Sequence, residues 1–119
     1  MLTAPAPLPV ASALPSALAL ERVIGEIAAD AAVALAKALR EFQTDGLSAR
    51  TRTHWGDLIT RLFELRVYAG QIDVYAVARA CGARLLQERH GKDLEARTIA
   101  VLIDAVIENL QQVVRAELN

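Results

Sequence analysis

The chain has 119 residues, enough to build one hydrophobic core but not two. Apolar residues make up 54% of it and aromatic residues only 4%, a composition typical of closely packed helices rich in Ala, Leu, Val and Ile. The net charge of −1 excludes a global attraction to nucleic acid or anionic membrane, and the single cysteine, Cys81, excludes an intrachain disulfide. We therefore expect a cytoplasmic all-α protein, and the large apolar fraction favours an oligomer.

The N-terminal segment is rich in proline and alanine. Four prolines between positions 5 and 15 interrupt any apolar helix, and no basic segment precedes them as in an export signal. We expect residues 1–15 to form a disordered arm and residues 16–119 to form a single helical domain. No stretch reaches the ~18 uninterrupted apolar residues that a membrane-spanning helix needs, so no membrane association is expected.

The first predicted helix covers about 16–43. Apolar residues recur there at three- and four-residue steps from Leu20 to Phe42, which places them on one face of a helix. Ser16 is a candidate N-cap, and Gly46 is a candidate stop. Half of the apolar positions are alanine, so we expect a neighbouring helix to approach closely.

The middle of the chain carries two apolar stripes. The first consists of Trp55, Leu58, Leu62, Leu65, Ala69, Ile72, Ala76 and Ala83. The second consists of Phe63, Val67, Gly70, Val74, Val77, Cys81 and Leu85. Both keep their helical phase across Gly70, and a turn would normally disturb that phase. The favoured interpretation is one helix over about 51–89. The alternative is two shorter helices that break near Gly70, with Asp73 capping the second.

The last predicted helix covers about 93–117. Its apolar stripe consists of Ile99, Ile103, Val106, Leu110 and Val113. His90 and Gly91 indicate a stop before it, and Asp93 is a candidate N-cap.

These helices predict a three-helix bundle or a long helical hairpin. A helix with two apolar sides would be the middle member, in contact with both others. At about 58 Å it would exceed its neighbours, each about 40 Å long, by the 1.5 Å rise per residue. The uncovered part predicts a homodimer formed through the long central helix.

A candidate interaction face lies on the same segment. On a continuous helix, Arg61, Tyr68, Tyr75 and Arg79 fall within a narrow sector away from both stripes. Arginine interleaved with tyrosine can contact phosphates and stack on bases, and residues 50–92 hold eight basic and four acidic side chains. A solvated face or a dimer contact is the favoured explanation of this sector, since Asp57 and Glu64 share it and Asp57 can partly neutralise Arg61.

Other candidate motifs favour ordinary structural roles. Ala78 and Gly82 have the spacing of a helix-turn-helix, but Glu88 stands where such a motif needs an apolar residue. His54 and His90 lie at opposite ends of the predicted central helix, so we do not expect them to meet within one chain or to bind a metal. Cys81, within an apolar stripe, is predicted to be a buried thiol.

No catalytic, cofactor or metal site is therefore expected. The sequence favours a non-catalytic helical interaction or scaffold protein that acts as a homodimer, with an unidentified protein as a possible further partner. The alternative is a small DNA- or RNA-binding accessory protein that uses the basic face of the central helix.

Overall fold

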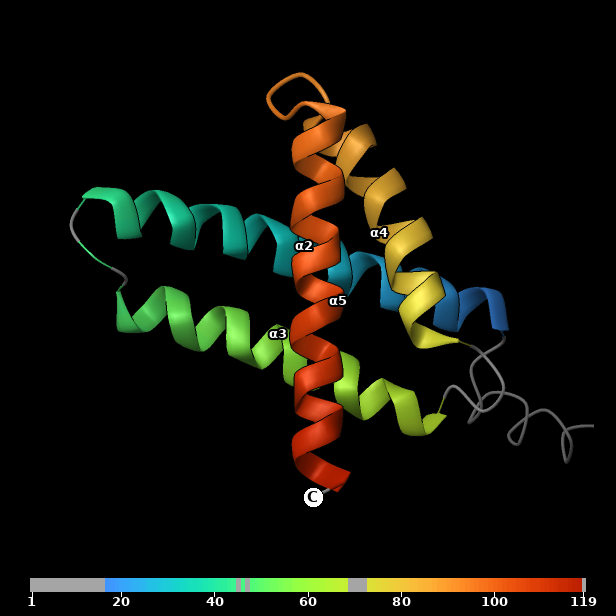
Figure 1. The fold of residues 1–119 in the computed structure, drawn as a ribbon. Coiled ribbons are helices and arrows are strands. Elements are labelled where there is room, and N and C mark those ends of the chain that lie inside the picture. Colours follow the sequence, from blue (N-terminus) through green and yellow to red (C-terminus); the bar gives the residue numbers. More distant parts are fainter. Residues whose placement is uncertain (1–16, 45, 47, 69–72, 119) are drawn as a thin grey trace, which may run out of the picture.

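The computed structural model describes residues 17–44, 46, 48–68 and 73–118, and these form helices joined by short turns. The helices are α2 (Ala17–Thr44), α3 (Ala49–Tyr68), α4 (Val74–His90) and α5 (Ala96–Leu118) (Figure 1). The all-α class is confirmed. The described part contains four helices, however, and not the three that the stripes predicted. The predicted arm, 1–15, lies outside the described residues.

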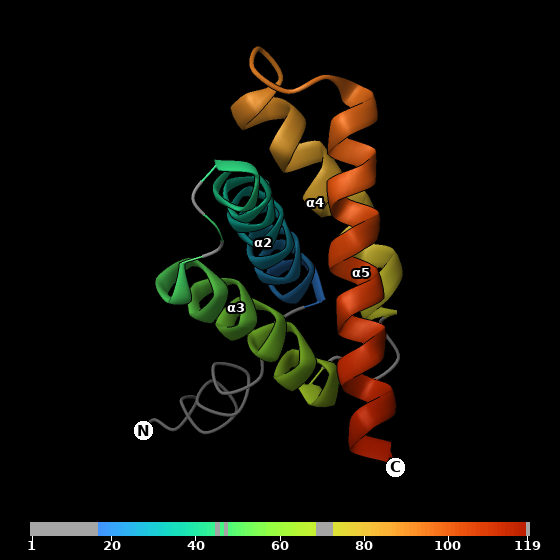
Figure 2. The ribbon, with the colours of Figure 1, turned by 60° about the vertical axis from the view of Figure 1, so that its left-hand side comes forward.

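The prediction of one central helix over 51–89 is wrong. Its span divides into α3 and α4, which run in different directions (Figures 1 and 2). Gly70 itself lies outside the described residues. Asp73 caps α4, because its carboxylate accepts hydrogen bonds from the backbone N–H groups of Tyr75 and Ala76 at 3.1 and 3.2 Å. The alternative interpretation, two helices with Asp73 as the second cap, is therefore confirmed.

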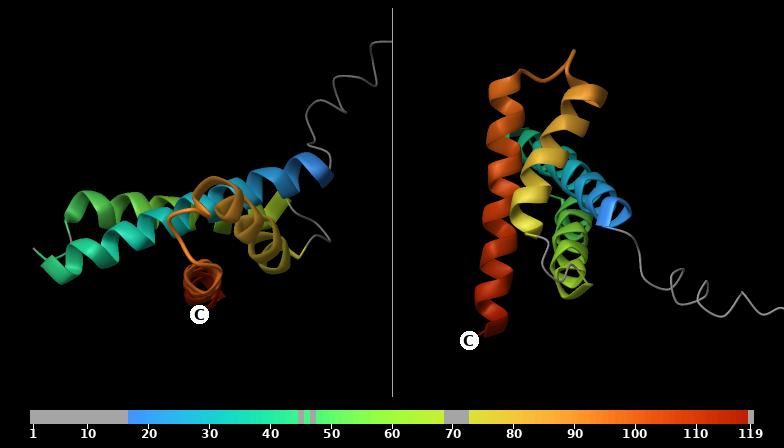
Figure 3. Two further views of the ribbon diagram at one scale, coloured as in Figure 1. Left: turned by 90° about the horizontal axis from the view of Figure 1, so that it is seen from above. Right: turned by 90° about the vertical axis from the view of Figure 1, so that its right-hand side faces the viewer.

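The four helices form two antiparallel pairs that cross. α2 and α3 lie side by side as one hairpin, and the pair of α4 and α5 crosses it steeply (Figures 1 and 3). α2 contacts all three other helices and packs most extensively on α4, whereas α3 barely touches α4. The middle member of the bundle is thus α2, and not the segment 51–89.

The core is centred on α2, which is buried over a wide arc. Its buried apolar residues are Leu20, Ile24, Ile27, Ala28, Ala29, Ala31, Ala32, Ala34, Leu35 and Ala38. The alanines allow α4 to approach closely, as expected: a Cβ atom at Gly82 would lie 3.0 Å from the Cβ of Ala28. Ala78 and Gly82 both lie inside α4, so this spacing serves helix packing and contains no helix-turn-helix turn.

The buried line of α4 differs from the predicted stripes. It consists of Val74, Ala78, Gly82 and Leu86. Ala76, assigned to the first stripe, is exposed, and Cys81, predicted to be buried, is half-buried. The register changes because α4 packs as a helix of its own, and its orientation is no longer fixed by α3.

The helix ends follow the predicted signals in most cases. α3 begins directly after Ser48, and α4 ends at His90 with Gly91 as its C-cap. Gly46, with φ of 86°, adopts the left-handed conformation that favours glycine after a helix. α5 begins at Ala96, three residues later than predicted, since Asp93 belongs to the preceding turn and the Glu95 carbonyl accepts from the Ile99 N–H.

Candidate binding surfaces of the α2–α3 hairpin

The residues of the predicted interaction face are divided between two helices. Arg61 is exposed on α3, whereas Tyr75 and Arg79 belong to α4. The Nε of Arg79 lies 3.3 Å from Oδ1 of Asp104 on α5, and Tyr75 is half-buried against the core. The side chain of Tyr68 lies outside the described part. Because α3 and α4 are separate, these residues do not share the single sector of a continuous helix.

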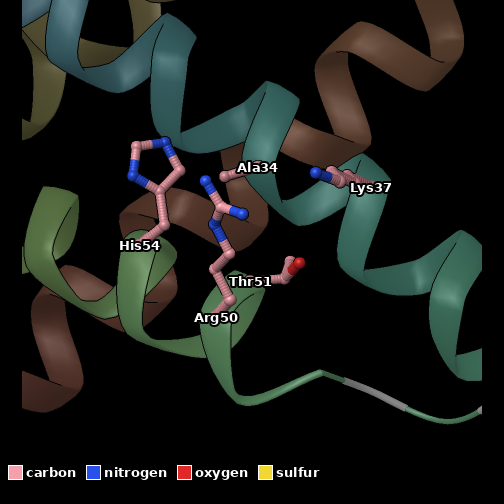
Figure 4. Close-up of a pocket in the computed structure, with 5 residues that line it drawn as sticks. All are labelled: Ala34, Lys37, Arg50, Thr51 and His54. Atoms are coloured by element: carbon pink, nitrogen blue, oxygen red, sulfur yellow. The ribbon is translucent and has the colours of Figure 1, made fainter.

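A pocket of about 400 Å³ lies between α2 and the first turns of α3. It is lined by Ala34, Lys37, Arg50, Thr51 and His54. Figure 4 shows the side chains of Arg50 and His54 extending from α3 towards α2, with the guanidinium group between the imidazole ring and Lys37. Nitrogen groups from two helices therefore face one space.

A second cavity, of about 390 Å³, continues from this pocket along the hairpin. It shares Ala34, Lys37 and His54 with the pocket and extends to Arg61 and His90. We call the surface formed by Lys37, Arg50, His54, Arg61 and His90 the basic groove. Asp30 also lines the second cavity, and its Oδ1 lies 3.7 Å from Nη1 of Arg89.

The two histidines provide a further correction. On one long helix, His54 and His90 would lie at opposite ends and could not meet. In the structure both line the second cavity, because α4 leaves the direction of α3 and returns its C-terminus to α2. The sequence could show which residues are basic, but it could not show which helix ends meet.

Helix periodicity places three of the basic residues of α3 on one face, whereas Arg52 falls on the other side and lines the cavity between α3 and α5. Arg50, His54 and Arg61 are separated by four and seven residues, spacings that return to the same side of a helix. Lys37 is exposed on α2 and lies outside the predicted apolar stripe of that helix. The spacing of the α3 residues is the signal that could have revealed the groove.

A polar network fixes the start of α3 against α2. The hydroxyl of Ser48 accepts from the backbone N–H of Thr51 at 3.2 Å, which caps the helix. The hydroxyls of Thr51 and Ser48 donate to the two carboxylate oxygens of Glu41 at 2.9 and 3.0 Å. Thr51 is buried, so this network connects the two helices at the edge of the pocket.

The hydrogen bonds to Glu41 stabilise its charged form. The bond from Thr51 is the main reason that the pKa of Glu41 is lowered, and the bonds from Ser48 and the charge of Lys37 act in the same direction. Among the described residues, ion pairs within 4.0 Å involve Arg22, Arg79 and Arg89, but not Lys37, Arg50, His54 or Arg61. Lys37, Arg50 and Arg61 thus make no direct ion pair within the described part, although Glu41 interacts with the charge of Lys37 and Asp30 lines the second cavity.

The end of α2 presents an apolar surface. Leu39 and Phe42 are 52% and 72% exposed, although they follow buried Leu35 and Ala38 by four residues and so continue the core face. The sequence placed Phe42 in the buried stripe. The structure exposes it because this end of the hairpin projects beyond α4 and α5 (Figure 1).

A third cavity, between α3 and α5, is mostly apolar. It measures about 310 Å³ and is lined by Arg52, Trp55, Gly56, Ile59, Thr60, Asn109 and Val113. The buried Nε1 of Trp55 has no hydrogen-bond partner among the described residues. Trp55 thus lines this cavity with an indole ring whose N–H is a hydrogen-bond donor without an acceptor in the described part.

Comparison with known proteins adds no functional assignment. No protein-family model, curated protein or solved structure matches the chain. In the part of the chain that the structure describes, no helix has both the length and the apolar character needed to cross a bilayer. The same residues contain no cluster of three or more His, Cys, Asp or Glu side chains arranged to hold a metal ion.

Proposed function

We propose that this protein is a non-catalytic helical interaction protein that acts as a homodimer. The observation that carries the proposal is the exposure of Leu39 and Phe42 in phase with the core face of α2. Burial of a large apolar side chain contributes roughly 1.5–3 kcal/mol, and a symmetric dimer would bury two such residues from each copy. Because α3 and α4 are separate helices, there is no long central helix to form the dimer contact. We therefore assign the dimer contact to the end of α2.

A second copy offers a surface that matches this patch. The cavity between α3 and α5 presents Trp55, Ile59 and Val113, which can receive an apolar side chain. In a twofold dimer, Phe42 of each copy would enter the cavity of the other, so that one contact is made twice. The charged residues at this end of α2 are Lys37, Arg40 and Glu41. They lie on other sides of the helix than Phe42 and would not oppose their copies.

The oligomeric state of the full chain tests the proposal. Light scattering coupled to size-exclusion chromatography is expected to give the mass of a dimer for the wild type. Phe42→Glu and Leu39→Glu are expected to give monomers, because each places a carboxylate in the contact. Both side chains are exposed, so both variants should remain folded by circular dichroism.

Val101→Glu is the matched control. Val101 is 62% exposed on α5 and belongs to neither the patch nor the cavity, so this variant should remain dimeric. A wild type that is monomeric at all concentrations would contradict the proposal. Loss of the dimer in Val101→Glu as well would show that the contact does not depend on the end of α2.

A further inference from the structure

The pocket at one end of the basic groove has the composition of an anion site. Lys37 reaches it from α2, and Arg50 and His54 reach it from α3 (Figure 4). Each of these exposed side chains could instead extend into solvent, where water and salt would screen the repulsion between the positive charges. Their convergence on one space of about 400 Å³ is favourable when a negative group occupies it.

The nearby carboxylate does not fill this role. Both oxygens of Glu41 accept hydrogen bonds, from Thr51 and from Ser48, and these bonds hold the carboxylate at the helix junction. The Thr51 hydroxyl already donates its proton to Glu41. Thr51 therefore lines the pocket but has no proton left to donate to a ligand. Arg50 and His54 keep their donors, and neither makes an ion pair within the described residues.

The donor set fits a tetrahedral dianion. A guanidinium group offers a planar fork of N–H donors, an ammonium group offers a compact charge, and an imidazole offers at least one N–H. Among the described residues, the lining contains no aromatic side chain other than imidazole, which leaves no larger ring there on which a nucleic-acid base could stack. We propose that this pocket binds the phosphate group of a small ligand, such as a phosphomonoester or a pyrophosphate.

The second cavity gives such a ligand room to extend. It opens from the pocket through Lys37 and His54 towards Arg61 and His90. A further phosphate or another acidic group of the ligand would meet Arg61 there. Asp30 lines the same cavity and pairs with Arg89, so its carboxylate disfavours a ligand that is negative along its whole length.

Titration of the full-length protein with pyrophosphate tests the site. Amide chemical shifts, followed at low ionic strength, are expected to change in a saturable manner around Lys37 and between Arg50 and His54. Arg50→Gln and Lys37→Gln should each weaken binding about tenfold, as expected for the loss of one charge-assisted hydrogen bond. Arg50 and Lys37 are both exposed, so the two variants should fold.

Arg97→Gln serves as the matched control, because Arg97 is exposed on α5 and lines neither cavity. It should bind pyrophosphate as the wild type does. Equal weakening in Arg97→Gln and Arg50→Gln, or shifts spread over all basic residues, would show non-specific charge attraction and overturn the proposal. Tighter binding of a single-stranded oligonucleotide at the same residues, with a steep loss on addition of salt, would also overturn it in favour of a nucleic-acid groove.

This test is independent of the proposed dimer. The pocket lies on the opposite side of α2 from Leu39, so Arg50→Gln should keep the mass of the wild type in light scattering. Phe42→Glu should in turn bind pyrophosphate with unchanged affinity. A monomeric protein that binds pyrophosphate would contradict the dimer alone, and a dimer without saturable binding would contradict the phosphate site alone.

Discussion

Gly25 of α2 lies directly against Cys81 of α4: a Cβ atom at position 25 would come 2.5 Å from the Cβ of Cys81. It would also lie 3.3 Å from the backbone carbonyl carbon of Cys81, so α4 itself would have to move. Together with the contact between Gly82 and Ala28, this approach sets the distance between the two most extensively packed helices. Cys81 therefore acts as a packing residue, and its Cβ is the atom that limits how closely α2 and α4 can approach.

Gly25→Ala is expected to destabilise the protein. Overpacking of a close contact costs about 1–3 kcal/mol, more than the gain of up to about 1 kcal/mol that alanine brings to a helix. Urea denaturation should show a lower midpoint with an unchanged slope. An equal or higher midpoint would show that α2 and α4 are not in contact at this position.

Gly56→Ala is the matched comparison, and we expect it to stabilise the protein where Gly25→Ala destabilises it. Gly56 lies inside α3, and a Cβ atom there would meet nothing within 4 Å. The helix gain of up to about 1 kcal/mol should then appear as increased stability. Both variants replace a helical glycine by alanine, so both gain helix propensity. The difference between their denaturation midpoints therefore reports the cost of overpacking the contact between α2 and α4.

Ser48→Ala should reduce stability by about 1 kcal/mol, because the Thr51 N–H would lose its acceptor and Glu41 would lose the hydrogen bond from the Ser48 hydroxyl. Thr53→Ala is the control: Thr53 is exposed on the same helix, and surface changes of this kind stay within about 0.5 kcal/mol. Thermal unfolding by circular dichroism can measure both. Equal effects would mean that Ser48 is not the cap of α3.

Glu41 predicts how stability depends on pH. Its pKa in the folded protein is lowered from the ordinary value of 4.5, chiefly by the hydrogen bond from Thr51. A depressed folded-state pKa contributes stability that is fully present above the unfolded-state pKa and is lost as pH falls through the folded-state pKa. The wild type should therefore lose stability below pH 4.5 more steeply than Glu41→Gln. Parallel curves for the two proteins would contradict the assignment.

The sequence could predict α2 and α5 because each is a single amphipathic helix without an internal break. It could not predict the separation of α3 and α4, because the apolar phases of two successive helices can agree by coincidence. A glycine costs a helix only about 1 kcal/mol, which is less than the packing of α4 on α2 can contribute. For the same reason, the basic residues were visible in the sequence but their meeting at one groove was not.

Two separate glutamate substitutions, at positions 78 and 76, can test which face of α4 is buried. Ala78 is fully buried against α2, so Ala78→Glu should destabilise the protein by about 3 kcal/mol or more, because it buries an uncompensated charge. Ala76 is exposed, and Ala76→Glu should change stability by no more than about 0.5 kcal/mol. A continuous helix with the predicted first stripe would reverse this order, since Ala76 would face the core. Chemical denaturation of the two variants therefore distinguishes the two packings of the same residues.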